Sequence, residues 1–266
     1  NHKLLIHEFY LDKFQTEKGQ IQNHVIYDIT DRFISDNRLI KFNFKQIFRT
    51  KRGKHSYLFT MSITFIIGIF MLPDLMNEMS IESQMFKLYI VYLLSGIFIY
   101  QHLNFFYAWD SYQVDFIHSS KIVFKKFILG RIIISVILSI PVYILFFGLS
   151  VVYNSLALVT ISALFYNIGY SAFALALFAS YSIKKIDVNQ TIFMNRQGET
   201  LLHYLSLLII FIPPLLTFLA FKNNLQIAYI INGLLGLSGI FLSSKWLALI
   251  YNQFQTRKYQ ILQELR

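Results

Sequence analysis

The chain contains no cysteine among its 266 residues. This absence excludes disulfide frameworks, thiolate zinc sites, iron–sulfur clusters and cysteine nucleophiles. A phosphate-binding loop of the pattern G-x-x-x-x-G-K-[ST] is also missing, so we expect no nucleotide chemistry of that kind in this chain. The chain opens on Asn1 without the basic, apolar and small-residue regions of a secretory signal, and we expect a truncated or internal start.

Charged residues are scarce, at 14% of the chain, whereas 55% of the residues are hydrophobic. In soluble domains about a quarter of the residues are charged. A soluble fold of this length could not bury so many apolar side chains, and disordered chains are poor in them. The composition therefore excludes a soluble enzyme and predicts an all-α membrane protein that crosses the bilayer several times.

Six apolar stretches are long enough, or nearly so, for the roughly 20 residues that a transmembrane helix needs. They lie at about Tyr57–Leu72, Leu88–Trp109, Ile128–Tyr153, Ser155–Tyr181, Leu201–Phe221 and Ile227–Ile250. Only Tyr153, Asn154 and Ser155 separate the third stretch from the fourth, which predicts a tight helical hairpin. We therefore predict a transmembrane domain of six helices over residues 57–250.

The basic residues are distributed unevenly between the loops. If both termini are cytoplasmic, the outer loops hold only Lys87 and Lys222, and the other 22 of the 24 lysines and arginines lie on the inner side. Cytoplasmic loops of membrane proteins carry such an excess, so both termini are predicted to be cytoplasmic. The same asymmetry explains the net charge of +10, and we expect membrane lipid as a partner and no nucleic acid.

The residues before the first span fall into two parts. Residues 1–37 are mixed and polar, and they indicate a cytoplasmic linker or small helical segment. Residues 38–56 predict an amphipathic elbow helix that ends in a basic knot of Arg49, Lys51 and Arg52. This helix either positions the bundle on the inner leaflet or is a plain charge anchor. Residues 251–266 are predicted to form a cytoplasmic tail.

Few residues offer chemistry. Asp110, Asp115 and His118 follow the second span, but their spacing matches no known zinc or paired-aspartate motif, so polar contacts in a cytoplasmic loop are favoured. His102 inside the second span is a functional candidate, although a structural role fits it equally well. No span carries a charged residue near its middle, which argues against an ion-coupled transporter. We therefore expect no enzyme activity, and any driving energy comes from another subunit.

Two helical faces in the later spans are distinctive. Small residues at a spacing of three, Gly233, Gly236 and Gly239, predict close helix packing in the sixth span. Polar and aromatic residues give the fourth span a second kind of face, made by Tyr166, Asn167 and Tyr170. With His102, this face either lines a path for an amphipathic substrate or forms hydrogen bonds between helices.

Four segments carry a family likeness, namely Leu39–Leu58, Ala108–Lys126, Asn167–Ala179 and Tyr181–Gly198. Their motifs are the knot Arg49-Thr50-Lys51-Arg52, the run Trp109-Asp110-Ser111 followed by Asp115, and the loop Lys185-Ile186-Asp187-Val188-Asn189 followed by Asn195-Arg196-Gln197-Gly198. The chain resembles the permease of ABC-2-type (type II exporter-like) ABC transporters, and more narrowly the C-terminal half of a large uncharacterised family of bacterial ABC permeases. Thr50 stands where that family usually has asparagine.

The resemblance implies a membrane subunit that is driven by a separate ATPase. Its ATPase-coupling loop would contain Trp109, Asp110, Ser111, Tyr112, Asp115, Phe116 and Lys121, and a second inner loop with Lys185, Asp187, Asn189, Asn195, Gln197 and Gly198 would contact the same subunit. ATP and magnesium would belong to that subunit, with no cofactor in this chain. The resemblance further implies a second six-span half, the bacterial cytoplasmic (inner) membrane, and export of a hydrophobic or amphipathic substrate.

Two other functions stay open from the residues alone. The first is a non-transporting membrane scaffold within a larger envelope assembly, which needs the same topology and no ATPase. The second is an intramembrane enzyme that acts on lipid with His102 or Asp110 in its site. This second alternative is the weaker one, because no convergent set of acid and base groups is visible.

Overall fold

The computed structural model describes residues 38–71, 81–110, 124–152, 155–191 and 198–265. Over these residues 86% of the chain is helical and no strand is present, which confirms the predicted all-α fold. The elements are α3 (Arg38–Arg49), α4 (Lys51–Ile66), η2 (Ile67–Met71), α6 (Ile81–Asn104), η3 (Ala108–Asp110), α8 (Phe124–Ser150), α9 (Ser155–Phe165), η4 (Tyr166–Ser171), α10 (Ala172–Phe178), α11 (Leu201–Ala220), α12 (Leu225–Phe241) and α13 (Ser243–Leu265). Here η2 and η4 are π-helical turns, and η3 is a 3-10 turn.

Several helices are long and apolar enough to cross a membrane. Three meet this criterion alone, at Phe124–Ser150, Leu156–Phe178 and Leu201–Ala220. The pair α12 and α13 meets it together, but the two helices are bent by 68° where they join. By length and composition, the described part of the chain therefore holds three or four candidate spans, as expected of a membrane protein.

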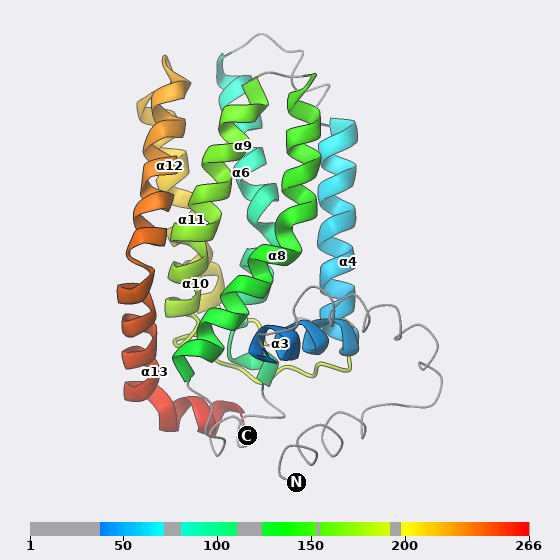
Figure 1. Ribbon diagram of the computed structural model, residues 1–266, viewed down its shortest axis with the longest axis vertical. Helices are drawn as coiled ribbons and strands as arrows, with labels where there is room; N and C mark the ends of the chain where they lie inside the picture. Colours follow the sequence, from blue (N-terminus) through cyan, green and yellow to red (C-terminus); the bar gives the residue numbers. More distant parts are fainter. Residues whose placement is uncertain (1–37, 72–80, 111–123, 153–154, 192–197, 266) are drawn as a thin grey trace.

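The upright helices form one bundle, and α3 lies across its lower end (Figure 1). The π turn η4 joins α9 and α10 into one continuous column beside α6 and α8. α6 is the central helix, because it contacts α4, α8, α9, α10 and α11. The helix α13 continues from α12 toward the same lower end where α3 lies (Figure 1). We call this lower end, with α3, η3 and the residues around them, the base of the bundle.

The outer surface of the bundle is apolar. On α11, Leu216 is 57% exposed and Leu219 is 52% exposed, and on α12 Ile230 and Leu234 are 60% and 59% exposed. Moving large apolar side chains out of water lowers the free energy. Their repeated exposure along neighbouring helices is therefore typical of a surface that faces lipid.

The close approach of α12 to the α9–α10 column depends on glycine. A Cβ on Gly236 would overlap backbone atoms of Phe165 and Tyr166, and a Cβ on Gly239 would lie 2.5 Å from the Gly169 carbonyl oxygen. Gly233 is less constrained, because its Cβ would meet the Ser162 Oγ at an ordinary 3.5 Å. Gly236 and Gly239 thus allow backbone-to-backbone packing of the kind that small residues give in membranes.

Tyrosines satisfy carbonyls that two prolines leave open in α11. A proline has no N–H, so Pro213 and Pro214 cannot bond the carbonyls four residues earlier, those of Ile209 and Ile210. The Tyr166 hydroxyl donates to the Ile210 carbonyl at 2.6 Å. The Tyr170 hydroxyl reaches the Ile209 carbonyl at 3.5 Å. Neighbouring side chains therefore replace the lost helix bonds, as the absence of water inside a bilayer requires.

Two predicted segments divide differently in the structure. The segment predicted as one elbow helix over residues 38–56 breaks at Thr50, because the Thr50 Oγ1 accepts a hydrogen bond from the Gly53 N–H and caps the start of α4. The stretch predicted as one span over Ile227–Ile250 bends after α12, and serines, which are favoured at helix starts, open α13. Residues 1–37 lie outside the described residues.

The packing of α12 generates a test. Gly236→Ala should lower the free energy of unfolding by about 1–3 kcal/mol, because the added methyl overlaps backbone that cannot rotate away. Gly148→Ala is the control, since a Cβ there meets nothing within 4 Å. The control should be neutral or gain up to about 1 kcal/mol from helix propensity. Unfolding in detergent micelles measures both, and equal stability of the two variants would contradict the close packing.

Candidate functional site

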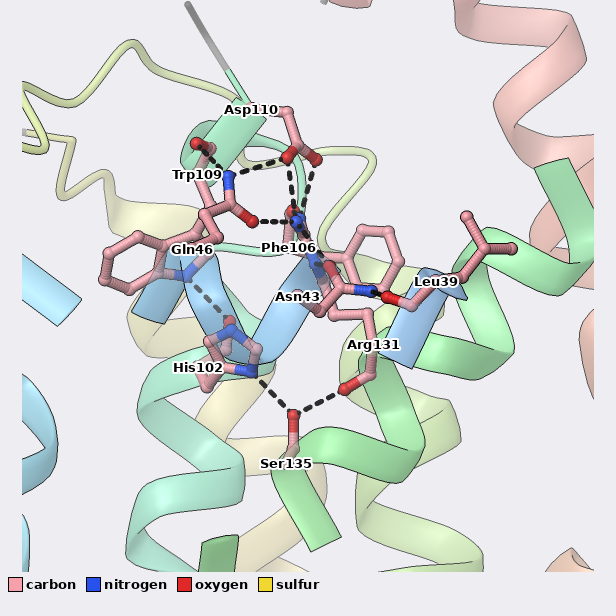
Figure 2. A network of polar contacts seen from close by, with 9 residues as sticks. All are labelled: Leu39, Asn43, Gln46, His102, Phe106, Trp109, Asp110, Arg131 and Ser135. Atoms are coloured by element: carbon pink, nitrogen blue, oxygen red, sulfur yellow. Dashed lines mark hydrogen bonds and ion pairs between the residues drawn. The ribbon is translucent and has the colours of Figure 1, made fainter. Parts of the chain in front are cut away.

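A buried arginine organises the base of the bundle. Arg131 lies two turns into α8 and its side chain is 0% exposed. A guanidinium has five N–H groups and is charged at every physiological pH, so burial is costly unless each group is bonded. Figure 2 shows its acceptors, which come from α3 and from the turn after α6 that ends in η3.

Asp110 is the charged partner of Arg131. The Arg131 Nη1 donates to the Asp110 Oδ2 at 2.7 Å, and the Nη2 donates to the Oδ1 at 2.8 Å, which makes a bidentate ion pair. A second donation from Nη1 goes to the Phe106 carbonyl. Asp110 ends the 3-10 turn η3, and the Trp109 indole N–H fixes this turn by donating to the His102 carbonyl at 3.1 Å. The end of α6 is thereby tied to α8.

The helix α3 supplies the remaining acceptors. The Asn43 Oδ1 accepts from the Arg131 Nε at 3.2 Å, and the Gln46 Oε1 accepts from the Nη2 at 2.8 Å. The Gln46 amide nitrogen then donates to the Asp110 Oδ1 at 3.0 Å and to the Trp109 carbonyl at 2.8 Å. Because Asn43 and Gln46 are three residues apart, they share one face of the helix. This face turns toward Arg131 and holds α3 across the base (Figure 2).

Aromatic rings and a second polar chain complete the cluster. The guanidinium carbon of Arg131 lies 5.1 Å from the ring centre of Phe106 and 5.0 Å from that of Phe127, within cation–π range. The Ser135 hydroxyl donates to the Arg131 carbonyl at 2.8 Å and lies 2.6 Å from the His102 Nδ1. His102 is therefore a buried link between α6 and α8.

The second inner loop closes the base on the side of α4. The Arg52 backbone N–H donates to the Val188 carbonyl at 3.0 Å, and the Arg52 guanidinium carbon lies 6.0 Å from the ring centre of Phe105. Ile186 and Val188 pack in one apolar cluster with Trp109 and Ala108. Gly198 has φ +86°, and a Cβ there would overlap Ile186, so only glycine suits this position.

The base brings together residues from all three predicted motifs. Trp109 and Asp110 of the predicted coupling loop, Arg52 of the basic knot, and Gly198 of the second inner loop take part in it. Lys51, Lys185 and Asn189 are exposed at its edge, whereas Arg49 and Asp187 are half-buried. The other predicted residues, Ser111, Tyr112, Asp115, Phe116, Lys121, Asn195 and Gln197, lie outside the described residues.

Three residues of this site were not predicted from the sequence, namely Arg131, Asn43 and Gln46. Arg131 lies inside the predicted third span, and an arginine within an apolar run must have a partner, so this signal was present. Asp110 was interpreted as a polar contact in a cytoplasmic loop, yet it is 5% exposed and ion-paired. No sequence spacing connects Asn43 to Arg131, because 88 residues separate them.

Of the predicted pathway residues, His102 lies at the base, whereas Tyr166, Asn167 and Tyr170 lie in a separate cluster higher in the bundle. Asn167 is fully buried, and its amide group accepts from the Tyr100 hydroxyl at 2.7 Å and donates to the Ser95 Oγ at 3.0 Å. Tyr166 and Tyr170 bond the open carbonyls of α11. These residues form hydrogen bonds between helices, and a substrate path along them stays a prediction.

The arrangement at the base can act as a mechanical linkage. Among the described residues no group of three or more histidine, aspartate or glutamate side chains could hold a metal ion. Arg131 and Asp110 form an ion pair with each other, and both also form hydrogen bonds with the side-chain amides of α3. What the cluster can do is join the lower ends of α3, α6 and α8 so that they move together.

Comparison with known families gives one match. The model of a family that is described as a family of unknown function (DUF5687) matches residues 1–266, the whole chain. No curated protein and no solved structure matches the sequence or the fold.

The buried ion pair generates a second test. Arg131→Met should lower the free energy of unfolding by about 3–5 kcal/mol, because it leaves the Asp110 carboxylate buried without its partner. The double variant Arg131→Met with Asp110→Asn should lose less than the single one, since no unpaired charge remains. Lys126→Met on the exposed face of the same helix is the control and should stay within about 0.5 kcal/mol. Additive losses in this double-mutant cycle would contradict the ion pair.

Proposed function

The chain belongs to the DUF5687 family, whose function is unknown, and we propose that it is the membrane-spanning permease subunit of an ATP-driven ABC transporter. Its likeness to ABC-2-type permeases supports this proposal, together with one structural observation. The three segments that carry the likeness on the inner side, around Arg52, Trp109–Asp110 and Ile186–Val188, form one connected base.

The proposed topology has six spans and both termini in the cytoplasm. The α4–η2 and α6 stretches supply the first two spans, α8 and the α9–α10 column the next two, and α11 and α12 the last two. α3 is the elbow helix at the inner leaflet, where the excess of lysine and arginine places the base. The membrane is the cytoplasmic (inner) membrane of a bacterium, and a second six-span half completes the pathway.

The ATPase is a separate subunit that binds ATP and magnesium. It docks on residues 109–126, and any displacement of this segment reaches the bundle through Trp109 and Asp110. Asp110 passes the displacement to α8 through Arg131, and Gln46 passes it to α3. The transported substrate is hydrophobic or amphipathic and moves outward, past a bundle whose described spans carry no charge near their middles.

Purification from native membranes in mild detergent tests this proposal. Mass spectrometry of the co-purified proteins should find a stoichiometric soluble ATPase with a Walker A loop. A clean preparation that carries envelope proteins and no ATPase would overturn the proposal and favour a membrane scaffold.

Variants in the coupling loop give a functional test. Asp110 is unsuitable, because its loss breaks a buried ion pair. Asp115→Ala with Phe116→Ala should instead uncouple the ATPase, and we expect stimulation of ATP hydrolysis by the permease to fall about tenfold, as when contacts worth about 1.4 kcal/mol are lost. Lys222→Met, in the turn between α11 and α12 that is predicted to lie on the outer side, is the control that should keep full stimulation. ATPase assays on reconstituted complexes measure this, and unchanged stimulation in the double variant would contradict the assignment of the loop.

A further inference from the structure

An aromatic stack joins α13 to the two stretches of chain on either side of residues 111–123, through Tyr107 before them and Phe124 after them. The Phe254 ring centre lies 3.9 Å from that of Phe124 with 20° between the ring planes. The Tyr107 ring lies near Phe254 as well, at 5.7 Å and 13°. Phe254 is 2% exposed, and Tyr107 is 5% exposed. One side chain of the C-terminal helix thus contacts the residues after α6 and the first residue of α8.

Further contacts on the same face of α13 support the stack. The Lys125 Nζ lies 5.1 Å from the ring centre of Tyr251, which precedes Phe254 by about one helical turn. The buried residues of α13 fall at helical spacing along one stripe, namely Ile250, Phe254, Ile261 and Leu265. The stripe shows that α13 is packed onto the base and does not project from it as a free tail.

The same helix is tied to the membrane bundle at two other points. The Arg257 Nη1 donates to the Ser180 carbonyl at 2.9 Å, and its guanidinium carbon lies 4.5 Å from the ring centre of Tyr181. Near the start of α13, Trp246 stacks with Phe173 of α10 at 6.4 Å. α13 then joins α12 at the 68° bend, and α12 packs backbone to backbone on η4 through Gly236 and Gly239. A continuous series of contacts therefore runs from Tyr107 and Phe124 to the interior of the bundle.

We infer that Phe254 is a positioning residue and that α13 is a lever between the base and α12. We call the contacts of Phe254 with Tyr107 and Phe124 the clasp, and through it a displacement of either residue moves α13 and, through the bend, α12. This route adds to the one through Arg131, and the two meet at the start of α8, where Phe124 stacks with Phe127, a ring that Arg131 also contacts. What displaces Tyr107 and Phe124 rests on the proposed function, whereas the clasp itself does not.

The test uses the natural absence of cysteine. Lys121→Cys introduces a single thiol into the segment, and its reaction rate with a membrane-impermeant maleimide is measured on inside-out vesicles. Phe254→Leu keeps apolar volume but removes the ring, so the labelling rate should rise about two- to tenfold, the range that loss of ring stacking gives. Phe254→Tyr keeps the ring and should restore the original rate. Tyr259→Leu is the matched control on the same helix, since Tyr259 is 82% exposed, and it should change nothing.

A second variant keeps the inference testable if Phe254→Leu folds poorly. Tyr107→Leu removes another ring of the stack and should raise the labelling rate as well, and combining it with Phe254→Leu should add little. Equal labelling of Phe254→Leu, Tyr259→Leu and the parent would overturn the clasp, as would fully additive effects in the double variant.

The ATPase assay separates this inference from the proposed function. Where an ATPase co-purifies, Phe254→Leu should retain binding of the ATPase but lose stimulation, and Phe254→Tyr should recover it. Altered labelling with no co-purified ATPase would keep the clasp and overturn the permease function. Unaltered labelling and stimulation with a bound ATPase would overturn the clasp and keep the permease function.

Discussion

The burial of one cation, Arg131, is the constraint on which the base of the bundle depends. A guanidinium cannot shed its charge, so the fold has to supply an acceptor for every N–H group. It does so with Asn43 and Gln46 of α3, and with Asp110 and the Phe106 carbonyl in the turn after α6. These bonds therefore fix α3, the 3-10 turn after α6 and the start of α8 relative to each other. Removing the cation would leave the Asp110 carboxylate without its charged partner and the amide oxygens of Asn43 and Gln46 without the donor that joins them to α8.

The bundle above the base is held by different means. Where no water is present, packing and hydrogen bonds between helices replace the hydrophobic effect as the source of stability. Gly236 lets α12 contact the π turn η4, and Tyr166 bonds the carbonyl that Pro214 leaves open. Both contacts lie on η4, and π turns inside helices are frequent at functional sites. The charged base and the apolar bundle therefore meet along α6, α8 and α12–α13, the elements through which a movement at one end would reach the other.

The sequence was sufficient for the helical class and for the general positions of the apolar helices, because both follow from local hydrophobic runs. The apolar face of α3 was also visible from spacing, and Ile40 and Ile47 are buried as that face requires. Two kinds of feature were not visible. Helix breaks at Thr50 and after Phe241 depend on single capping bonds and on packing against other helices. The network at Arg131 and the stack at Phe254 join residues that are far apart in the chain, and a single sequence carries no record of such pairs.

The proposed permease function requires that a soluble ATPase docks on the segment after Asp110. Site-specific photo-crosslinking in native membranes tests it most directly, with a photoreactive phenylalanine at position 116 in place of Phe116. The same group at Leu216, which is 57% exposed on the apolar outer surface, is the control. We expect a crosslink from position 116 to an ATPase with a Walker A loop, and crosslinks from position 216 to lipid or membrane protein only. Crosslinks from position 116 to lipid, or to envelope proteins without an ATPase, would contradict it.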